Sequence, residues 1–100
     1  MARKNSELIQ QRKLQKMVGI FKAVAHPMRL QIVNILMKGE YSVGNLMNML
    51  GAKQSLTSQQ LSILKYVGIV KFRRNGNIVF YTIKTESIRK IMEAIIKEIS

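Results

Sequence analysis

The hydrophobic pattern of this 100-residue chain changes its period once, after Gly68, and this change limits the possible folds more than any other feature. Over residues 70–73 and 78–83 successive side chains alternate as they do in β-strands. Asn75-Gly76, between these runs, predicts a two-residue hairpin turn in which both central residues have positive φ. Before and after this segment the apolar spacing is helical. The sequence therefore predicts a mainly α fold with a small β-hairpin, an α+β class.

Helical periodicity and end signals place five helices around the hairpin. Pro27 is suited to the first position of a helix, where its missing N–H would be unpaired in any case. Gly39, Gly51 and Gly68 each follow an apolar helical segment and are typical helix stops. Ser42 can cap the third helix. We expect helices over residues 6–24, 27–38, 43–50, 54–67 and 85–99, in the order α-α-α-α-β-β-α.

The third and fourth expected helices are joined by a tight glycine turn, which makes them a helix-turn-helix candidate. A hairpin with basic residues at its tip follows directly. This order is the plan of a winged helix-turn-helix. A chain of 100 residues is expected to form one domain, so residues 1–100 are assigned to a single DNA-binding domain.

The charge is strongly one-sided, with 17 basic and 5 acidic residues and a net charge of +12. Between Glu40 and Glu86 there are six bases and no acid, a net charge of +6. Such a field attracts a polyanion, which favours double-stranded DNA as the partner. A solvated lysine-rich surface is the alternative. A membrane surface is not expected as the partner, because it calls for one basic amphipathic helix with bulky aromatic residues.

The residue types that the chain lacks narrow its chemistry. It has no cysteine, one histidine and no aspartate. A disulfide, a thiolate zinc site and a catalytic thiol are therefore excluded, as is a His/Asp metal cage within one chain. We expect no catalytic residues, no metal and no cofactor. No apolar run approaches the ~20 residues that span a bilayer, and no signal peptide is recognisable, so the expected location is the cytoplasm.

The start of the fourth expected helix carries the candidate base contacts. With Thr57 and Leu61 facing inward, its small and amide side chains lie on the outer side. Glutamine can pair with adenine and serine with several bases or a phosphate, and this end of the helix enters the major groove in the motif. An uncharged surface turn is the alternative. The candidate base contacts are Gln54, Ser55, Leu56, Ser58 and Gln59.

The hairpin tip and two lysines are the candidate phosphate contacts. Arg73 and Arg74 place two guanidinium groups on the tip, where they can enter a minor groove or hold a phosphate. The alternative is an edge hairpin that charge protects from aggregation. Lys53 and Lys65 would set the register on the DNA without selecting its sequence. Asn75 and Asn77 complete the predicted DNA-binding set.

The first and last expected helices carry apolar stripes that predict a homodimer. The last helix is too apolar for an exposed terminal element, although it could simply cover the core of its own chain. We expect the two helices to form a two-fold contact, each fully buried side chain contributing about 1.5–3 kcal/mol. The predicted dimer residues are Leu14, Met17, Val18, Phe21, Ile88, Ile91, Met92, Ile95, Ile96 and Ile99.

Two further expectations concern the histidine and the tyrosines. His26 precedes Pro27 and is interpreted as a helix-cap histidine. The three tyrosines, Tyr41, Tyr66 and Tyr81, are interpreted as hydrophobic framework with a solvated hydroxyl.

Several separated segments, in order, resemble ArsR/SmtB-type transcriptional repressors. They are residues 21–30 (FKAVAHPMRL), 39–46, 54–61 and the run from Gly68 through Arg73-Arg74-Asn75-Gly76 to 79–81. The match covers about residues 21–96, and the QS…SQ pattern is similar to that of haemolysin-gene activators and nodulation-gene repressors. The resemblance implies a dimeric winged-helix protein on promoter operators, with residues 54–67 as recognition helix and 71–82 as wing. It also implies dimerisation through the first and last helices.

The chain departs from the family pattern at the sensory positions. Metal-sensing members carry Cys-x-Cys where this chain has Ser42-Val43-Gly44, and the other metal site uses Asp and His on the last helix, where neither occurs. The cysteine pair of thiol-sensing members is also absent. The helix motif also differs at three positions. The usual serine is replaced by Lys53, the usual aliphatic residue by Thr57 and the usual histidine by Gln60. These changes bear on sensing and on the bound sequence rather than on the fold.

The sequence thus favours a sequence-specific, homodimeric transcriptional regulator, more specifically a repressor, and no enzyme. A nonspecific architectural DNA- or RNA-binding protein is the alternative, because the net charge alone would suit it. A winged helix that contacts only proteins is a third possibility, against which the long acid-free interval counts.

Overall fold

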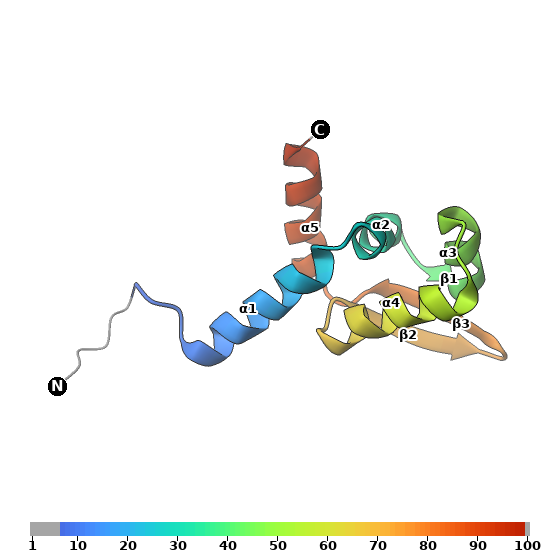
Figure 1. Ribbon diagram of the computed structural model, residues 1–100, viewed down its shortest axis with the longest axis horizontal. Helices are drawn as coiled ribbons and strands as arrows, with labels where there is room; N and C mark the ends of the chain where they lie inside the picture. The colour runs from blue at the N-terminus through green and yellow to red at the C-terminus, as the bar shows by residue number, and fades with distance from the viewer. Residues whose placement is uncertain (1–6, 100) are drawn as a thin grey trace.

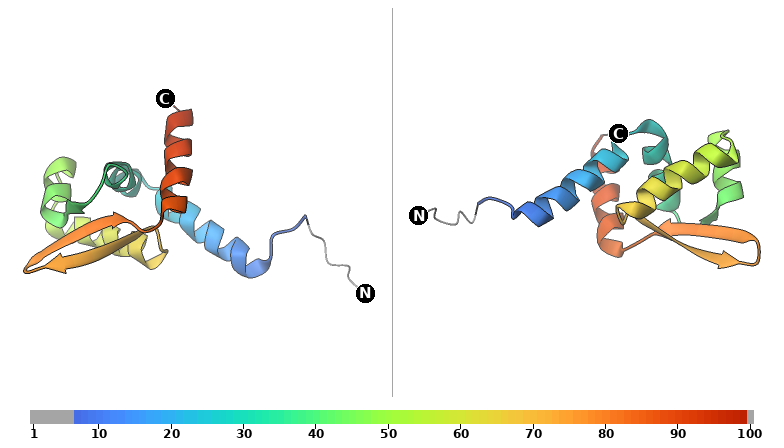
Figure 2. Two further views of the ribbon diagram at one scale, coloured as in Figure 1. Left: turned by 180° about the vertical axis from the view of Figure 1, so that it is seen from behind. Right: turned by 60° about the horizontal axis from the view of Figure 1, so that its bottom comes forward.

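The computed structural model describes residues 7–99, and within them it has five helices and a three-stranded antiparallel sheet (Figure 1). The helices are α1 (Gln11–Val24), α2 (Pro27–Leu36), α3 (Val43–Leu50), α4 (Gln54–Tyr66) and α5 (Glu86–Glu98). The strands are β1 (Tyr41–Ser42), β2 (Val70–Asn75) and β3 (Ile78–Ile83). The predicted class and the winged helix-turn-helix order are confirmed. Both end helices, α1 and α5, project from a body made of α2, α3, α4 and the hairpin (Figure 2).

Helix ends follow the predicted signals, except at the start of α1 and at the end of α2, which ends at Leu36 instead of residue 38. Ser42 caps α3, its Oγ accepting a hydrogen bond from the backbone N–H of Asn45 at 3.0 Å, and Gly51 ends α3 at φ +63°. The first helix was predicted to begin at residue 6, which lies outside the described residues, but residues 7–10 are not helical. Leu8 and Ile9 are exposed there. Without a surface to pack on, a helix end gains little stability from propensity alone.

A third strand was not predicted. The two residues of β1 pair with β3, Tyr41 opposite Tyr81 and Ser42 opposite Phe80, so the sheet order is β1-β3-β2. A strand of two residues is too short to show an alternating pattern in the sequence. It nevertheless anchors the start of α3 to the hairpin.

The hairpin turn lies one residue further along than predicted. Asn75 pairs with Ile78 in the β2–β3 ladder, so Gly76 and Asn77 are the central residues, and only Gly76 has positive φ, at +63°. The prediction that Asn75 and Gly76 both adopt positive φ was wrong. Glycine at the first central position is typical of the II′ turn, which closes a two-residue hairpin as well as the I′ turn does.

The core is formed by α2, α3, α4 and the hairpin, with contributions from both end helices. Its fully buried residues include Leu61 and Leu64 of α4, and Thr57 lies beside them as predicted. The Thr57 hydroxyl donates a hydrogen bond to the carbonyl oxygen of Lys53 at 2.9 Å, so this buried polar group is satisfied. The buried apolar residues are Ala23, Ile32, Val33, Leu36, Leu46, Leu61, Leu64, Ile69, Val70, Tyr81, Ile83 and Met92.

An arginine of α2 ties three helices together. Nε of Arg29 donates to the carbonyl oxygen of Ala23 at the end of α1, at 2.6 Å, and its Nη1 donates to Oε1 of Gln60 on α4, at 2.8 Å. Gln60 is buried. These bonds fix α4 relative to α1 and α2.

Candidate nucleic-acid interface

One face of α4 is exposed to solvent, opposite the face that packs into the core. Four exposed residues, Ser55, Gln59, Ser62 and Tyr66, recur at spacings of four, three and four, which puts them on one face of the helix. We call this face the outer stripe. Sequence analysis found its first half but missed Ser62 and Tyr66, although their spacing from Ser55 was the available signal. Tyr66 is 90% exposed and is not framework, contrary to the prediction.

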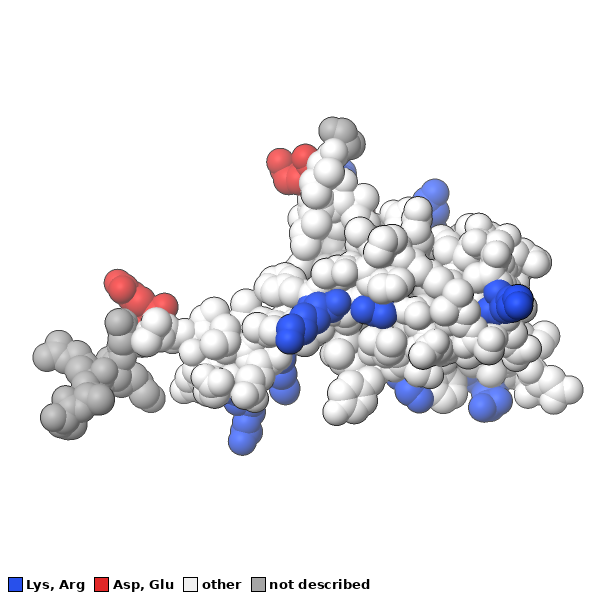
Figure 3. Space-filling model, in the orientation of Figure 1, with Lys and Arg blue, Asp and Glu red and all other residues white. Residues whose placement is uncertain are grey.

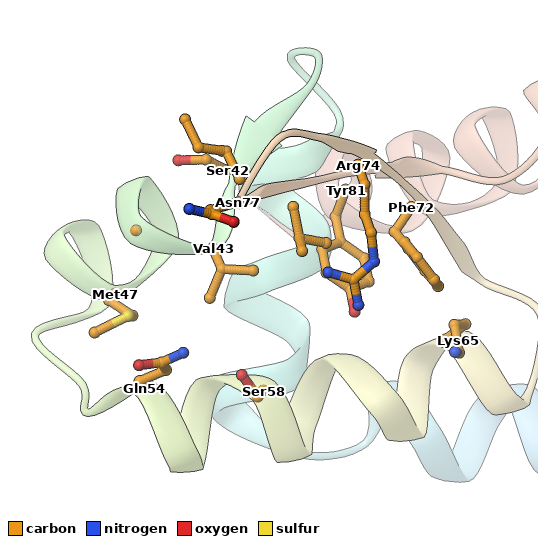
Figure 4. Close-up of a pocket in the computed structure, with 13 residues that line it drawn as sticks. Ser42, Val43, Met47, Gln54, Ser58, Lys65, Phe72, Arg74, Asn77 and Tyr81 are labelled. Atoms are coloured by element: carbon orange, nitrogen blue, oxygen red, sulfur yellow. The ribbon is translucent and has the colours of Figure 1, made fainter.

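A cleft of about 620 Å³ is lined by residues of α4, α3 and the hairpin. Three predicted contact residues of α4, Gln54, Ser58 and Lys65, line one side of it, and Arg74 and Asn77 of the hairpin face them (Figure 4). The fold thus brings together polar and basic side chains separated by up to 23 positions in the sequence. The cleft continues the outer stripe of α4 toward the wing.

Two cations share one aromatic ring in this cleft. Nζ of Lys65 lies 4.7 Å from the ring centroid of Phe72, and Cζ of Arg74 lies 6.0 Å from it. Contacts of this kind orient a cation without neutralising it. The Phe72 ring in turn packs on Tyr81, with centroids 5.7 Å apart. Burial raises the pKa of the Tyr81 hydroxyl.

The two neighbouring arginines of the wing have different surroundings. Side chains alternate along a strand, so Arg74 faces α4 while Arg73 lies on the opposite side. Nε and Nη2 of Arg73 donate to the two carboxylate oxygens of Glu40, both at 2.7 Å, and its Cζ lies 4.6 Å from the Phe80 ring. The hydrogen bond from Arg73 lowers the pKa of Glu40. Arg73 is therefore held against β1, away from the cleft that Arg74 lines.

The remaining predicted DNA contacts lie apart from this cleft. Lys53 and Leu56 line a more apolar cleft of about 800 Å³ with Pro27 and Met49, on the α2 side of the helix-turn-helix. Asn75 is the last residue of β2. The structure therefore divides the predicted set between two sides of α4, a division that helical spacing alone did not reveal.

Basic side chains are distributed over α1, α4 and the hairpin in the view of Figure 3, whereas acidic ones gather near the outer ends of α1 and α5. Among residues 7–99 there is no group of three or more His, Cys, Asp or Glu side chains that could hold a metal ion. None of the helices described is long and apolar enough to cross a membrane.

His26 lies at the start of α2, as predicted. It occupies the N-cap position of α2, but its side chain makes no capping hydrogen bond. Its Nδ1 is buried and has no hydrogen-bond partner among the described residues. The prediction of a helix-cap residue at His26 is confirmed, and the extended backbone before Pro27, rather than the imidazole, sets the start of the helix.

The predicted dimer residues divide into two groups. On α5 and at its C-cap, Ile91, Ile95 and Ile99 are exposed, by 54%, 41% and 79%, whereas Ile88 and Met92 face the core. Met92 is only 2% exposed, so its side chain serves its own core and not a partner. On α1, the exposed apolar residues are Leu14, Val18 and Phe21. Met17 and Ile96 are half-buried.

Comparison with known proteins places this geometry in a family. Residues 26–71 match the family described as bacterial regulatory protein, arsR family. The chain is 34% identical over 85 residues to the biofilm growth-associated repressor of Xylella fastidiosa, covering 85% of this chain and 75% of that protein. It is 38% identical over 78 residues to the transcriptional activator HlyU of Vibrio cholerae, covering 78% of this chain and 72% of HlyU.

Solved structures agree with the sequence matches. HlyU from Vibrio cholerae superposes with a TM-score of 0.81 at 35% identity, covering 86% of this chain and 94% of that one. The homodimeric winged helix-turn-helix DNA-binding domain of a possible ArsR-family regulator from Mycobacterium bovis gives 0.84 at 28% identity, covering 99% and 89%. The family match, these identities and the common fold lead to one conclusion: this chain belongs to the arsR family of bacterial regulatory proteins.

Proposed function

We propose that this protein is a homodimeric repressor that binds two-fold symmetric operator DNA with the N-terminal part of the outer stripe of α4, Ser55, Gln59 and Ser62, in the major groove. The observation that carries the proposal is the stripe itself, a row of exposed serine and glutamine side chains beside a basic cleft. Residues 1–100 act as one domain in this proposal. The protein works in the cytoplasm, where a regulator of this family meets its operators.

The outer stripe has the chemistry of base recognition. The amide of Gln59 can donate to and accept from an adenine edge at the same time, and Ser55 and Ser62 can bond several bases or a phosphate. Their side chains are exposed, so they need no rearrangement to reach a groove. Gln54 and Ser58, nearer the wing, extend the same surface toward the cleft.

The wing contributes phosphate binding through Arg74 rather than through both arginines. Arg74 lines the cleft that opens beside α4, with Lys65 across the Phe72 ring. Arg73 is already engaged in two charge-assisted hydrogen bonds to Glu40, and such bidentate pairs are strong. In this proposal Arg73 fixes the position of the wing and Arg74 contacts the DNA.

Dimerisation is supported by apolar side chains that their own chain leaves uncovered. Val18 and Phe21 of α1 and Ile91 and Ile95 of α5 are each at least 40% exposed. A cleft of about 600 Å³ adjoins α5 and is lined by Val24, Leu30 and Ile96, among others. In this proposal a helix of the partner packs into it. The Mycobacterium bovis relative is a homodimer, and the Xylella fastidiosa relative is a repressor.

The experiment is selection of bound fragments from the source genome, followed by footprinting under an excess of random DNA. We expect protection of two half-sites about 34–36 Å apart, or a multiple of that distance, on one face of the duplex. Equal competition by random DNA would instead identify a nonspecific architectural protein. Absence of binding to any duplex would leave a winged helix that contacts only proteins.

A further inference from the structure

A second basic cleft, of about 660 Å³, lies at the base of the hairpin, where Lys84 and Thr85 follow β3. Its lining residues come from α1, the C-terminal end of α4 and the chain that follows β3. Arg12 and Lys16 of α1, Tyr66 of α4 and Lys84 after β3 line it, and none of its ten described lining residues is acidic. We call it the α1–α4 cleft.

The side of α1 that lines this cleft is opposite its apolar stripe. Arg12, Lys16 and Gly19 are spaced by four and three residues, which places them on one face. Leu14 and Phe21 lie about half a turn away, at 3.6 residues per turn. One face of α1 is therefore available to a partner chain while the other lines the basic cleft.

The floor of the cleft is packed and closely defined. A Cβ placed on Gly19 would lie 3.9 Å from Cγ1 of Val67, so α1 rests on the end of α4 at this point. Nζ of Lys84 lies 3.9 Å from the Cβ position of Gly68, directly over the loop that follows α4. The backbone N–H of Lys84 donates to the carbonyl oxygen of Ile69 at 2.9 Å, which fixes the base of the hairpin.

The ion pairs seen among the described residues do not neutralise the positive charge of the cleft. Those pairs join Glu40 to Arg73 and Glu86 to Arg89, and none of these four residues lines the cleft. Three cations gathered without a carboxylate repel one another and attract an anion. Tyr66, 90% exposed at the edge of the cleft, adds a hydroxyl that can donate to an anionic oxygen.

We infer that the α1–α4 cleft binds phosphates of the DNA backbone next to the bases that α4 contacts, an inference that rests on the proposed function. Tyr66 belongs to both the outer stripe and the cleft. From Ser55 to Tyr66 the helix advances roughly 16 Å, which exceeds the ~12 Å width of a major groove, so a helix that enters the groove with its N-terminal residues and crosses it cannot keep Tyr66 over the bases. When the start of α4 lies on base edges, its other end therefore meets the backbone. Lysine, arginine and tyrosine are common phosphate contacts.

The position of the bound phosphates follows from the dimer. Because the apolar face of α1 would contact the partner, α1 lies near the two-fold axis, and the cleft lies between that axis and α4. The contacted phosphates are then those between the two half-sites. They are distinct from the outer phosphates that the wing reaches through Arg74.

The test compares Lys16→Gln and Lys84→Gln with the matched control Lys13→Gln. Lys13 has the same charge on the same helix but does not line the cleft. Binding to the selected operator is measured by fluorescence anisotropy at several salt concentrations. Each cleft variant should reduce the slope of log K against log salt by about 0.9 per contact, or about 1.8 per dimer. The control should keep the wild-type slope.

Each outcome decides between distinct conclusions. If wild-type protein binds DNA and the cleft variants keep the slope of Lys13→Gln, the inference about the cleft is wrong while the proposed function stands. If wild-type protein binds no duplex, both fail. A parallel titration with tripolyphosphate distinguishes DNA phosphates from a free anion. If tripolyphosphate binding depends on Lys16 while the salt slope of DNA binding is unchanged in the cleft variants, the cleft binds a free anion and the inference is wrong. Ethylation interference should show the affected phosphates between the half-sites.

Discussion

Arg29 and Gln60, 31 positions apart in the sequence, are joined by a hydrogen bond of 2.8 Å from the guanidinium of one to the buried side-chain carbonyl of the other. The same guanidinium bonds the carbonyl oxygen of Ala23, at the end of α1. The helix that carries the outer stripe is thus fixed to the helix that carries the apolar stripe. The angle between two recognition helices in a dimer depends on such fixed connections.

Replacing Arg29 with methionine should destabilise the protein by about 1–3 kcal/mol, because the Gln60 oxygen would be left buried without a donor. Gln60→Leu removes the same bond from the other side. The double variant should lose less than the sum of the two, since no buried oxygen of Gln60 is then left unpaired. Urea unfolding at one protein concentration measures these values. Strict additivity would show that the bond contributes nothing.

The hairpin turn should depend on Gly76 alone. Gly76→Ala places a side chain at φ +63° and should cost about 1–2 kcal/mol. Gly44→Ala is the control, because Gly44 lies within α3 without positive φ, and there alanine should raise stability by about 0.4–1 kcal/mol. Thermal unfolding of both variants tests the turn assignment. Equal effects at the two positions would contradict it.

The pair of Glu40 and Arg73 should make wing stability depend on pH. The pKa of Glu40 is lower in the folded protein than its ordinary value of 4.5, because Arg73 donates hydrogen bonds to the carboxylate. The unfolded chain therefore binds this proton more tightly, and the stabilisation is complete above pH 4.5 and lost as the pH falls through the lower folded pKa.

The difference in unfolding temperature between wild type and Glu40→Gln should accordingly be largest near neutral pH and shrink on acidification. An NMR titration of the Glu40 carboxyl gives the same information for the single group. Glu93→Gln, which removes an exposed carboxylate on α5, is the control. A Glu40 carboxyl that titrates at or above its ordinary pKa would contradict the assignment.

Base and phosphate contacts should separate in three alanine variants. Gln59→Ala should cost about 1–3 kcal/mol at particular base pairs and relax the preference there. Arg74→Ala should weaken binding to all duplexes and reduce the salt slope by about 1 per contact. Arg73→Ala should change the slope less, because its guanidinium is bonded to Glu40. Binding to a panel of operator variants at two salt concentrations distinguishes the three. Identical behaviour of Arg73→Ala and Arg74→Ala would contradict the division of the wing.

The exposed isoleucines of α5 should hold the dimer. Ile95→Glu places a charge in the proposed contact and removes about 1.5–3 kcal/mol of apolar burial per protomer, so it should shift the protein toward monomer. Met49→Glu, at a comparably exposed apolar residue of α3, should leave the dimer intact. Sedimentation equilibrium measures both. A wild-type protein that sediments as a monomer at all concentrations would refute the homodimer.

The sequence by itself determined the five helices, the hairpin and their order, but not the two-residue strand β1. Helical and alternating periods, Pro27 and the terminal glycines are local signals, because each depends on neighbours within a turn or two. These signals located α2, α3, α4, the hairpin and α5 within a few residues. The family motifs lie within these same elements. The net charge of +12 is also independent of the fold, and it was sufficient to indicate a polyanionic partner.

Tertiary structure decided which of the predicted side chains act together. Arg73 and Arg74 are equivalent in the sequence, but Glu40, 33 positions before Arg73, engages only one of them. Met92 belongs to the same apolar stripe as Ile91 and Ile95, yet only packing shows that it faces its own core. The α1–α4 cleft likewise joins residues from three parts of the chain. Such pairings are non-local, and no periodicity in the sequence specifies which distant segments meet.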